Sequence, residues 1–127
     1  MLKAKDVMAK NVITISPDAT LAGAIELLIA KEISGLPVVD TKGKMVGIIS
    51  EKDLLNFAFS GNLHSTKVKE AMSKNVTSFS PDADVDSIAL AIGQHQFRRV
   101  PIVEEGKVVG IISRRDIIRV ALKIDTK

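Results

Sequence analysis

The chain has 127 residues, of which 46% are hydrophobic and 26% charged, so it can bury a sizeable core and is not a disordered polymer. It has no cysteine, which excludes disulfides, thiolate metal sites and a cysteine nucleophile. The net charge is +3, and residues 64–127 carry the excess, which indicates either an anionic partner or a solvated basic face.

The first half of the chain predicts the element order β-α-β-β-α. Val12-Ile-Thr-Ile is short and rich in β-branched residues, as strands are. The turn residues Ser16-Pro-Asp-Ala follow, and then apolar residues at helical spacing from Leu21 to Leu28 predict a helix. Either Asp18 or Thr20 would cap that helix.

The rest of the first half predicts a hairpin and a second helix. Leu36-Pro-Val-Val predicts a strand whose proline favours an edge or a strand start. Asp40-Thr-Lys-Gly predicts the hairpin turn, and the apolar run Met45-Val-Gly-Ile-Ile predicts a strand buried on both faces. The last helix is expected to begin after Ser50.

The second half repeats the first. Met8-Ala-Lys-Asn-Val returns as Met72-Ser-Lys-Asn-Val, and Gly47-Ile-Ile-Ser-Glu-Lys-Asp returns as Gly110-Ile-Ile-Ser-Arg-Arg-Asp. Ser16-Pro-Asp-Ala recurs as Ser80-Pro-Asp-Ala, and Leu36-Pro-Val-Val-Asp returns as Val100-Pro-Ile-Val-Glu. The chain therefore contains two copies of one unit, predicted as residues 1–60 and 61–127, here called the first and second repeat. In the second repeat, either Asp82 or Asp84 would cap the helix that contains Ile88 and Ile92.

One such unit would bury too little surface to be comfortable alone. We therefore expect an α+β fold in which two β-α-β-β-α repeats pack as one pseudo-twofold module. Such packing would create two equivalent clefts between the repeats.

The order and duplication of these motifs resemble a tandem pair of CBS (cystathionine-β-synthase) domains, also called a Bateman module, over nearly the whole chain. The resemblance implies a free-standing regulatory module, not an enzyme, that binds adenosine nucleotides (AMP, ADP or ATP) between its repeats, as energy-sensing modules do. It also implies a homodimer and a regulated protein partner, which the sequence does not identify.

The duplicated heptapeptide permits two interpretations. Ser-x-x-Asp at a helix start is a capping box, which explains Ser50, Asp53, Ser113 and Asp116 without a ligand. The resemblance implies instead that Asp53 and Asp116 hold ribose hydroxyls and that the two serines lie near phosphates at a helix N-terminus. Gly47 and Gly110 would permit close backbone approach. The two roles are compatible.

The repeats differ in charge beside this motif. Arg98 and Arg99 precede Val100-Pro, where the first repeat has Ser34 and Gly35 before Leu36-Pro. Arginine suits phosphate because its fork makes two charge-assisted hydrogen bonds. We therefore expect the better phosphate site near Asp116. The pattern does not decide which of the two arginines faces the ligand, and Arg114 and Arg115 are further candidates.

The resemblance implies that the base lies against a segment of the other repeat. The residues expected around the base near Asp116 are Lys10, Asn11, Val12, Ile13 and Val38. Those expected near Asp53 are Lys74, Asn75, Val76, Thr77 and Ile102. For the apolar members of both sets, packing in the core is the alternative.

Other functions find less support in the sequence. No catalytic motif can be assembled, and His64 and His95 without a carboxylate cluster make a poor metal site. S-adenosylmethionine, nucleic acid and a purely structural dimerisation role remain alternatives, although the scarcity of aromatic residues disfavours single-stranded nucleic acid. The charged N-terminus and the lack of an apolar run of about 18 residues predict a cytoplasmic protein with no membrane span.

Overall fold

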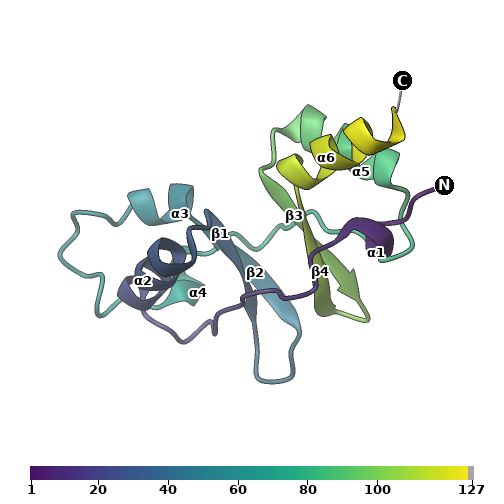
Figure 1. The fold of residues 1–127 in the computed structure, drawn as a ribbon. Coiled ribbons are helices and arrows are strands. Elements are labelled where there is room, and N and C mark those ends of the chain that lie inside the picture. The colour runs from purple at the N-terminus through teal and green to yellow at the C-terminus, as the bar shows by residue number, and fades with distance from the viewer. Residues whose placement is uncertain (126–127) are drawn as a thin grey trace. The chain divides into compact units, whose positions relative to one another are not determined.

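The fold is mixed α+β, as predicted. A computed structural model describes residues 1–125, and within that range it has six helices and two antiparallel hairpins (Figure 1). No helix in the described part of the chain is long and apolar enough to cross a membrane.

The chain forms two compact units that do not follow the order of the repeats. Ile13–Val76 forms one of them, here called the central unit. The other, the split unit, combines Met1–Val12 with the residues from Thr77 onwards. The first twelve residues, which belong to the first repeat, therefore pack with the body of the second.

The central unit is built around a hairpin of β1 (Gly35–Val39) and β2 (Met45–Ser50). The helices α2 (Leu21–Lys31), α3 (Glu51–Leu55) and α4 (Val68–Ala71) complete it. In β2, Gly47 and Ile49 are buried and the other four residues are half-buried, so the strand is fully buried on one face rather than on both as its apolar sequence predicts. The side chains of the core are Leu21, Ala24, Leu28, Leu36, Val38, Ile49, Leu54 and Val68.

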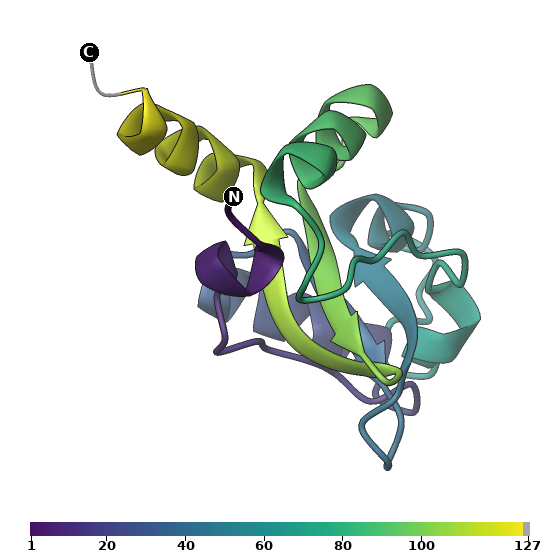
Figure 2. The same ribbon diagram turned by 90° about the vertical axis from the view of Figure 1, so that its right-hand side faces the viewer.

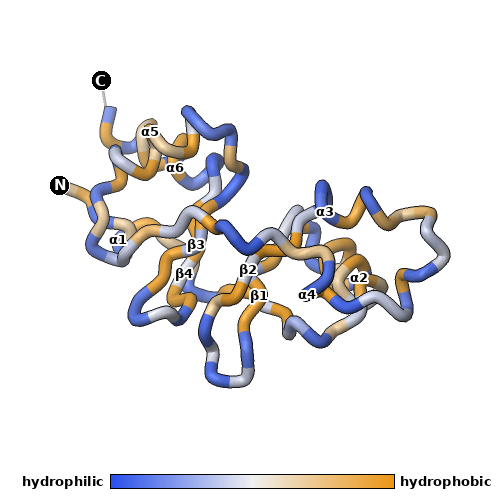
Figure 3. The backbone as a smooth tube through the Cα atoms, turned by 180° about the vertical axis from the view of Figure 1, so that it is seen from behind, coloured by the Kyte–Doolittle hydropathy of each residue, from blue (hydrophilic) through white to orange (hydrophobic). Residues whose placement is uncertain are grey.

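The split unit has the same plan. Its hairpin joins β3 (Arg99–Glu104) to β4 (Lys107–Ser113), and its helices are α1 (Ala4–Val7), α5 (Val85–His95) and α6 (Arg114–Ile124). Glu104 pairs with Lys107, so Glu105 and Gly106 form a two-residue turn, and both have positive φ as such turns require. The core side chains are Ala4, Ile88, Ile92, Val100, Ile102 and Ile112. Figure 3 shows hydrophobic strands and hydrophilic turns in both hairpins.

The strand predicted at residues 12–15 is wrong: only a single parallel bridge forms, between Ile15 and Val38. The Ile15 amide donates to the Pro37 carbonyl, and the Val39 amide donates to Ile15. The next rung would need the amide hydrogen of Pro37 on one side or of Pro17 on the other, and proline has none. Phe79 and Ile102 make the equivalent bridge in the split unit, where Pro81 and Pro101 occupy the same places.

The predicted helix caps are confirmed at three of four positions. Thr20 Oγ1 accepts a hydrogen bond from the Gly23 amide at 3.0 Å and caps α2. Ser50 and Ser113 form complete capping boxes at α3 and α6. At α5 the Asp84 side chain makes no capping bond, because its carboxylate instead accepts a hydrogen bond from Lys3 Nζ at 2.9 Å.

The short helices α1 and α4 attach to the Ser-Pro-Asp-Ala loops of their units by matching bonds. The Ala4 amide donates to Ala83 at 2.8 Å, and the Val68 amide donates to Ala19 at the same distance. Within the split unit, α1 contacts α5, α6 and β4 (Figure 2). Each sequence repeat thus supplies the leading helix for the body of the other repeat.

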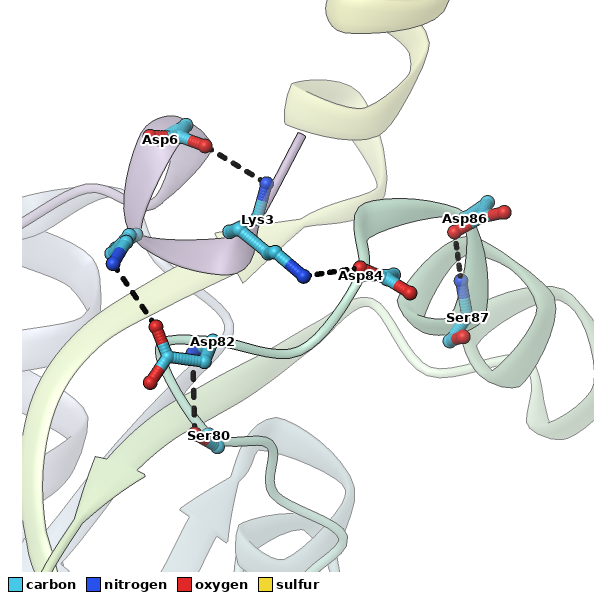
Figure 4. A network of polar contacts seen from close by, with 8 residues as sticks. Lys3, Asp6, Ser80, Asp82, Asp84, Asp86 and Ser87 are labelled. Carbon is cyan, nitrogen blue, oxygen red and sulfur yellow. Dashed lines mark hydrogen bonds and ion pairs between the residues drawn. The ribbon is translucent and has the colours of Figure 1, made fainter. Parts of the chain in front are cut away.

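Charged side chains reinforce this attachment in the split unit. Lys3 pairs with Asp84 at 2.9 Å (Figure 4), and Lys5 pairs with Asp82 at 3.0 Å. The hydrogen bond to Asp84 raises the pKa of Lys3 above its usual 10.5, and the hydrogen bond to Asp82 does the same for the pKa of Lys5. In the central unit, the corresponding Lys69 lies 3.2 Å from Asp18.

Candidate functional site

The junction between β4 and α6 presents a carboxylate at the start of an eleven-residue helix. Asp116 Oδ2 accepts a hydrogen bond from the Ser113 amide at 2.9 Å, and Ser113 Oγ accepts one from the Asp116 amide at 3.1 Å. The Asp116 side chain remains 26% exposed, and its Oδ1 lies 3.7 Å from Arg119 Nη1. The capping interpretation is therefore correct for this motif, and it engages mainly one of the two carboxylate oxygens.

Strand register places Arg99 beside this carboxylate motif. Arg99 is the cross-strand partner of Ser113, and directly opposed residues in a sheet have their side chains on the same face. Val100 and Ile112, the next pair, face the core, so Arg99 and Ser113 lie on the opposite face of the hairpin. Arg99 is half-buried, with its Nε atom buried, whereas Arg98 is exposed. The carbonyl of Arg98 accepts a hydrogen bond from the Arg114 amide at 2.9 Å, so backbone contact joins the two basic pairs.

The segment after α1 runs beside β4. The Ala9 amide donates to the Ile111 carbonyl at 2.9 Å, and the Ile111 amide donates back to Ala9 at 3.0 Å. Lys10 and Asn11 follow immediately and are exposed, and Val12 is half-buried. The split unit thus contains eight of the residues that are predicted for the site near Asp116: Lys10, Asn11, Val12, Arg98, Arg99, Gly110, Ser113 and Asp116.

The central unit has the same backbone arrangement with a different polar network. Asp53 Oδ2 accepts from the Ser50 amide at 2.9 Å and from Ser50 Oγ at 3.0 Å. Its Oδ1 accepts from Ser73 Oγ at 3.1 Å. Sequence reasoning missed Ser73, although the repeat alignment, which places it opposite Ala9, contained the signal.

Four of the predicted residues lie in the other unit from their proposed carboxylate. Ile13 and Val38 belong to the central unit, and Thr77 and Ile102 belong to the split unit. Val38 and Ile102 have no exposed surface and lie in the cores of their units, which is the packing alternative. Asn75 and Val76 share the central unit with Asp53, and Asn75 is exposed.

The glycine and the methionine that recur in both repeats have a packing explanation. A Cβ added to Gly110 would lie 2.6 Å from Met8 Cγ, and one added to Gly47 would lie 2.8 Å from Met72 Sδ. Both glycines are buried in their hairpins. The small size of these glycines therefore allows the segments that contain Met8 and Met72 to lie directly over β4 and β2. This packing brings residue 9 close to the junction of β4 and α6, and residue 73 close to the junction of β2 and α3.

The two histidines take no part in these junctions. His95 stacks on Phe97 with ring centroids 5.3 Å apart, and His64 is exposed in the segment between α3 and α4. Among residues 1–125, no three histidine or carboxylate side chains gather as a metal site would require.

Comparison with known proteins gives the family. The model of the CBS domain matches residues 4–60 and again residues 68–123. The chain belongs to the CBS domain family. The inosine-5'-monophosphate dehydrogenase of Methanocaldococcus jannaschii is 38% identical over 118 residues, which are 92% of this chain but 23% of that enzyme. The chain therefore matches only a CBS region of this relative, and the similarity does not extend to the rest of the enzyme.

Two solved CBS pairs cover this chain almost completely. CBSX2 of Arabidopsis thaliana in complex with AMP is 28% identical, covers 98% of both chains and has a TM-score of 0.89. The CBS domain pair of protein MJ0100 in complex with 5'-methylthioadenosine and S-adenosyl-L-methionine is 30% identical. It covers 98% of this chain and 99% of its own, with a TM-score of 0.86. Both of these similar proteins hold adenosine compounds.

Proposed function

We propose that this CBS pair is a regulatory module that binds an adenosine nucleotide, AMP, ADP or ATP, at the junction of β4 and α6. The observation that carries the proposal is the Asp116 carboxylate at the start of α6, whose side chain is 26% exposed. It follows Ser113, which is the cross-strand partner of Arg99. A carboxylate can accept hydrogen bonds from two hydroxyls of a ribose, as it does in other nucleotide sites. The AMP complex of the similar CBSX2 supports this class of ligand.

The charge near Asp116 favours a phosphorylated ligand. Arg98 and Arg99 belong to the split unit, as do Arg114 and Arg115 at the start of α6. The positive end of the α6 dipole lies at the same point, where it stabilises anions. The central unit carries Ser34 and Gly35 in place of the β3 arginines, so its charge favours phosphate less.

An S-adenosyl compound is the second candidate ligand, because the similar MJ0100 pair was solved with two such molecules. These compounds have no phosphate, so they would leave the arginines without a role. Arg99→Gln separates the two candidates. We expect it to weaken AMP and ATP binding at least tenfold and to leave adenosine binding nearly unchanged, because only the former carry phosphate.

Ligand-induced thermal stabilisation tests the nucleotide proposal. A ligand at about 100 times its Kd should stabilise the protein by roughly 2.7 kcal/mol. Asp116→Ala should abolish this increment, measured against the ligand-free variant so that the loss of the helix cap cancels. Asp86→Ala, an exposed aspartate in the first turn of α5, is the matched control and should respond like the wild type. An unchanged response of Asp116→Ala would contradict the ribose assignment.

We further propose that the module acts as a homodimer that signals to a partner protein. Ile118 and Leu122 lie one helical turn apart on α6 and are 69% and 76% exposed, and Leu90 on the contacting helix α5 is 63% exposed. A second copy would bury these apolar side chains. Light scattering of Leu122→Glu should report a monomer if α6 forms the interface, and an unchanged dimer mass would place the interface elsewhere.

A further inference from the structure

The hydroxyl of Ser73 lies beside Asp53 in the central unit, and the split unit has no hydroxyl at the equivalent position beside Asp116. Ser73 exchanges two backbone hydrogen bonds with Ile48, at 2.8 and 2.9 Å, and its Oγ donates to Asp53 Oδ1 at 3.1 Å. Ala9 makes the same backbone exchange with Ile111. Ala9 has no hydroxyl, so Asp116 Oδ1 receives no bond from this position.

The difference decides how many acceptor positions each carboxylate has left. A carboxylate offers about four lone-pair positions, and a ribose diol needs two of them. Within its unit, Asp53 accepts three hydrogen bonds: two from Ser50 on Oδ2 and one from Ser73 on Oδ1. Among residues 1–125, Asp116 accepts one hydrogen bond, from the Ser113 amide, and its Oδ1 lies 3.7 Å from Arg119 Nη1. Asp116 can therefore accept both sugar hydroxyls, and Asp53 cannot without losing an existing bond.

We propose that residues 9 and 73 determine which of the two carboxylates binds a sugar, so that each chain binds one nucleotide. Ser73 occupies an acceptor position of Asp53, whereas Ala9 leaves the equivalent position of Asp116 available. This inference rests on the proposed function and adds a specificity-determining pair to it. The choice is independent of the phosphate-binding arginines, because it acts on a neutral part of the ligand. It therefore applies to adenosine as well as to AMP.

Exchanging the residues at positions 9 and 73 tests this proposal. Ala9→Ser introduces the hydroxyl beside Asp116, and Ser73→Ala removes it beside Asp53. Both side chains are exposed, and each repeat already accommodates the residue proposed for the other on an equivalent backbone. Ala121→Ser and Ser87→Ala, both exposed on helices of the split unit, are matched controls with the same chemical changes.

Isothermal titration with AMP and with adenosine gives the readout. We expect one binding event per wild-type chain, about tenfold weaker binding of both ligands by Ala9→Ser, and a second event in Ser73→Ala. The controls should titrate like the wild type. Two equal events in the wild type, or unchanged titrations of both exchanged variants, would overturn the role of residues 9 and 73 while leaving nucleotide binding intact. A wild type that binds neither ligand would instead overturn the proposed function itself, and this inference with it.

Discussion

Gly110→Ala should destabilise the split unit because the strand has no room for a methyl group beneath Met8. The added Cβ would lie 2.6 Å from Met8 Cγ and 2.9 Å from Met8 Cβ, and real Cβ atoms essentially never approach so closely. Gly110 does not have positive φ, so the backbone itself accepts alanine. Overpacking of this kind costs about 1–3 kcal/mol, and the lower chain entropy of alanine offsets about 0.4–1 kcal/mol of it.

A double-mutant cycle with Met8→Ala isolates this steric cause. Met8 is half-buried, so its truncation alone should cost about 1–2 kcal/mol, less than for a fully buried methionine. In the double variant the alanine methyl at position 110 enters space that Met8 has vacated. The double variant should therefore lose less stability than the two single variants lose together. The coupling free energy should be about 1 kcal/mol or more, as expected for residues in contact.

Gly93→Ala provides the control of opposite sign. Gly93 lies within α5, and a Cβ there would have nothing within 4 Å. Helix propensity predicts a gain of about 0.5–1 kcal/mol from this change. Urea unfolding followed by circular dichroism measures all four variants. The steric explanation is wrong if Gly110→Ala is as stable as the wild type. It is also wrong if Gly110→Ala loses the same free energy of unfolding whether residue 8 is methionine or alanine.

Two further predictions concern the helix starts and the leading helices. Thr20→Ala should lower the free energy of unfolding by about 1 kcal/mol at any salt concentration, because it removes a capping bond. The loss of stability caused by Asp84→Ala should instead become smaller in 1 M salt, because Asp84 makes an exposed ion pair. A cost of Asp84→Ala that salt does not change would refute the ion-pair assignment. The pKa values of Lys3 and Lys5 are raised above 10.5, so the stability that these lysines contribute is complete below pH 10.5 and is lost as pH rises through the folded-state pKa. The unfolding midpoint of the wild type should therefore approach that of Lys3→Gln/Lys5→Gln in strongly alkaline solution, a range where the absence of tyrosine and cysteine leaves lysine as the main titrating group. A stability difference that persists undiminished at high pH would contradict this assignment. Lys107→Gln, an exposed lysine at the start of β4, is the control.

Local features of this fold were predictable because they depend on residues close together in the chain. The capping boxes at Ser50 and Ser113 need only the residue three positions later, and both formed. The two hairpins follow from apolar runs that flank turn residues. The predicted strand at residues 12–15 failed because its pairing depends on Pro37, more than twenty positions away, which lacks the amide hydrogen for a second rung.

The candidate site was predictable only in part, for a related reason. Ser113 and Asp116 belong to one helix start, and the strand register that places Arg99 opposite Ser113 follows from the hairpin. The bond from Ser73 to Asp53 joins residues twenty positions apart through a backbone bridge that no local pattern specifies. For Val38 and Ile102 the sequence leaves a place near the base and packing in the core as alternatives, and strand alternation turns both side chains into the cores.

The exchange of leading segments means that neither repeat determines its own junction. Asp116 belongs to the second repeat, but residue 9, which lies beside its strand, comes from the first. Likewise, Ser73 of the second repeat bonds Asp53 of the first. A substitution at position 9 or 73 therefore alters the junction of the other repeat and leaves that repeat's own heptapeptide untouched. Two copies that share the motif Ser-x-x-Asp can consequently differ in ligand binding, although the residues that would hold the sugar are the same in both.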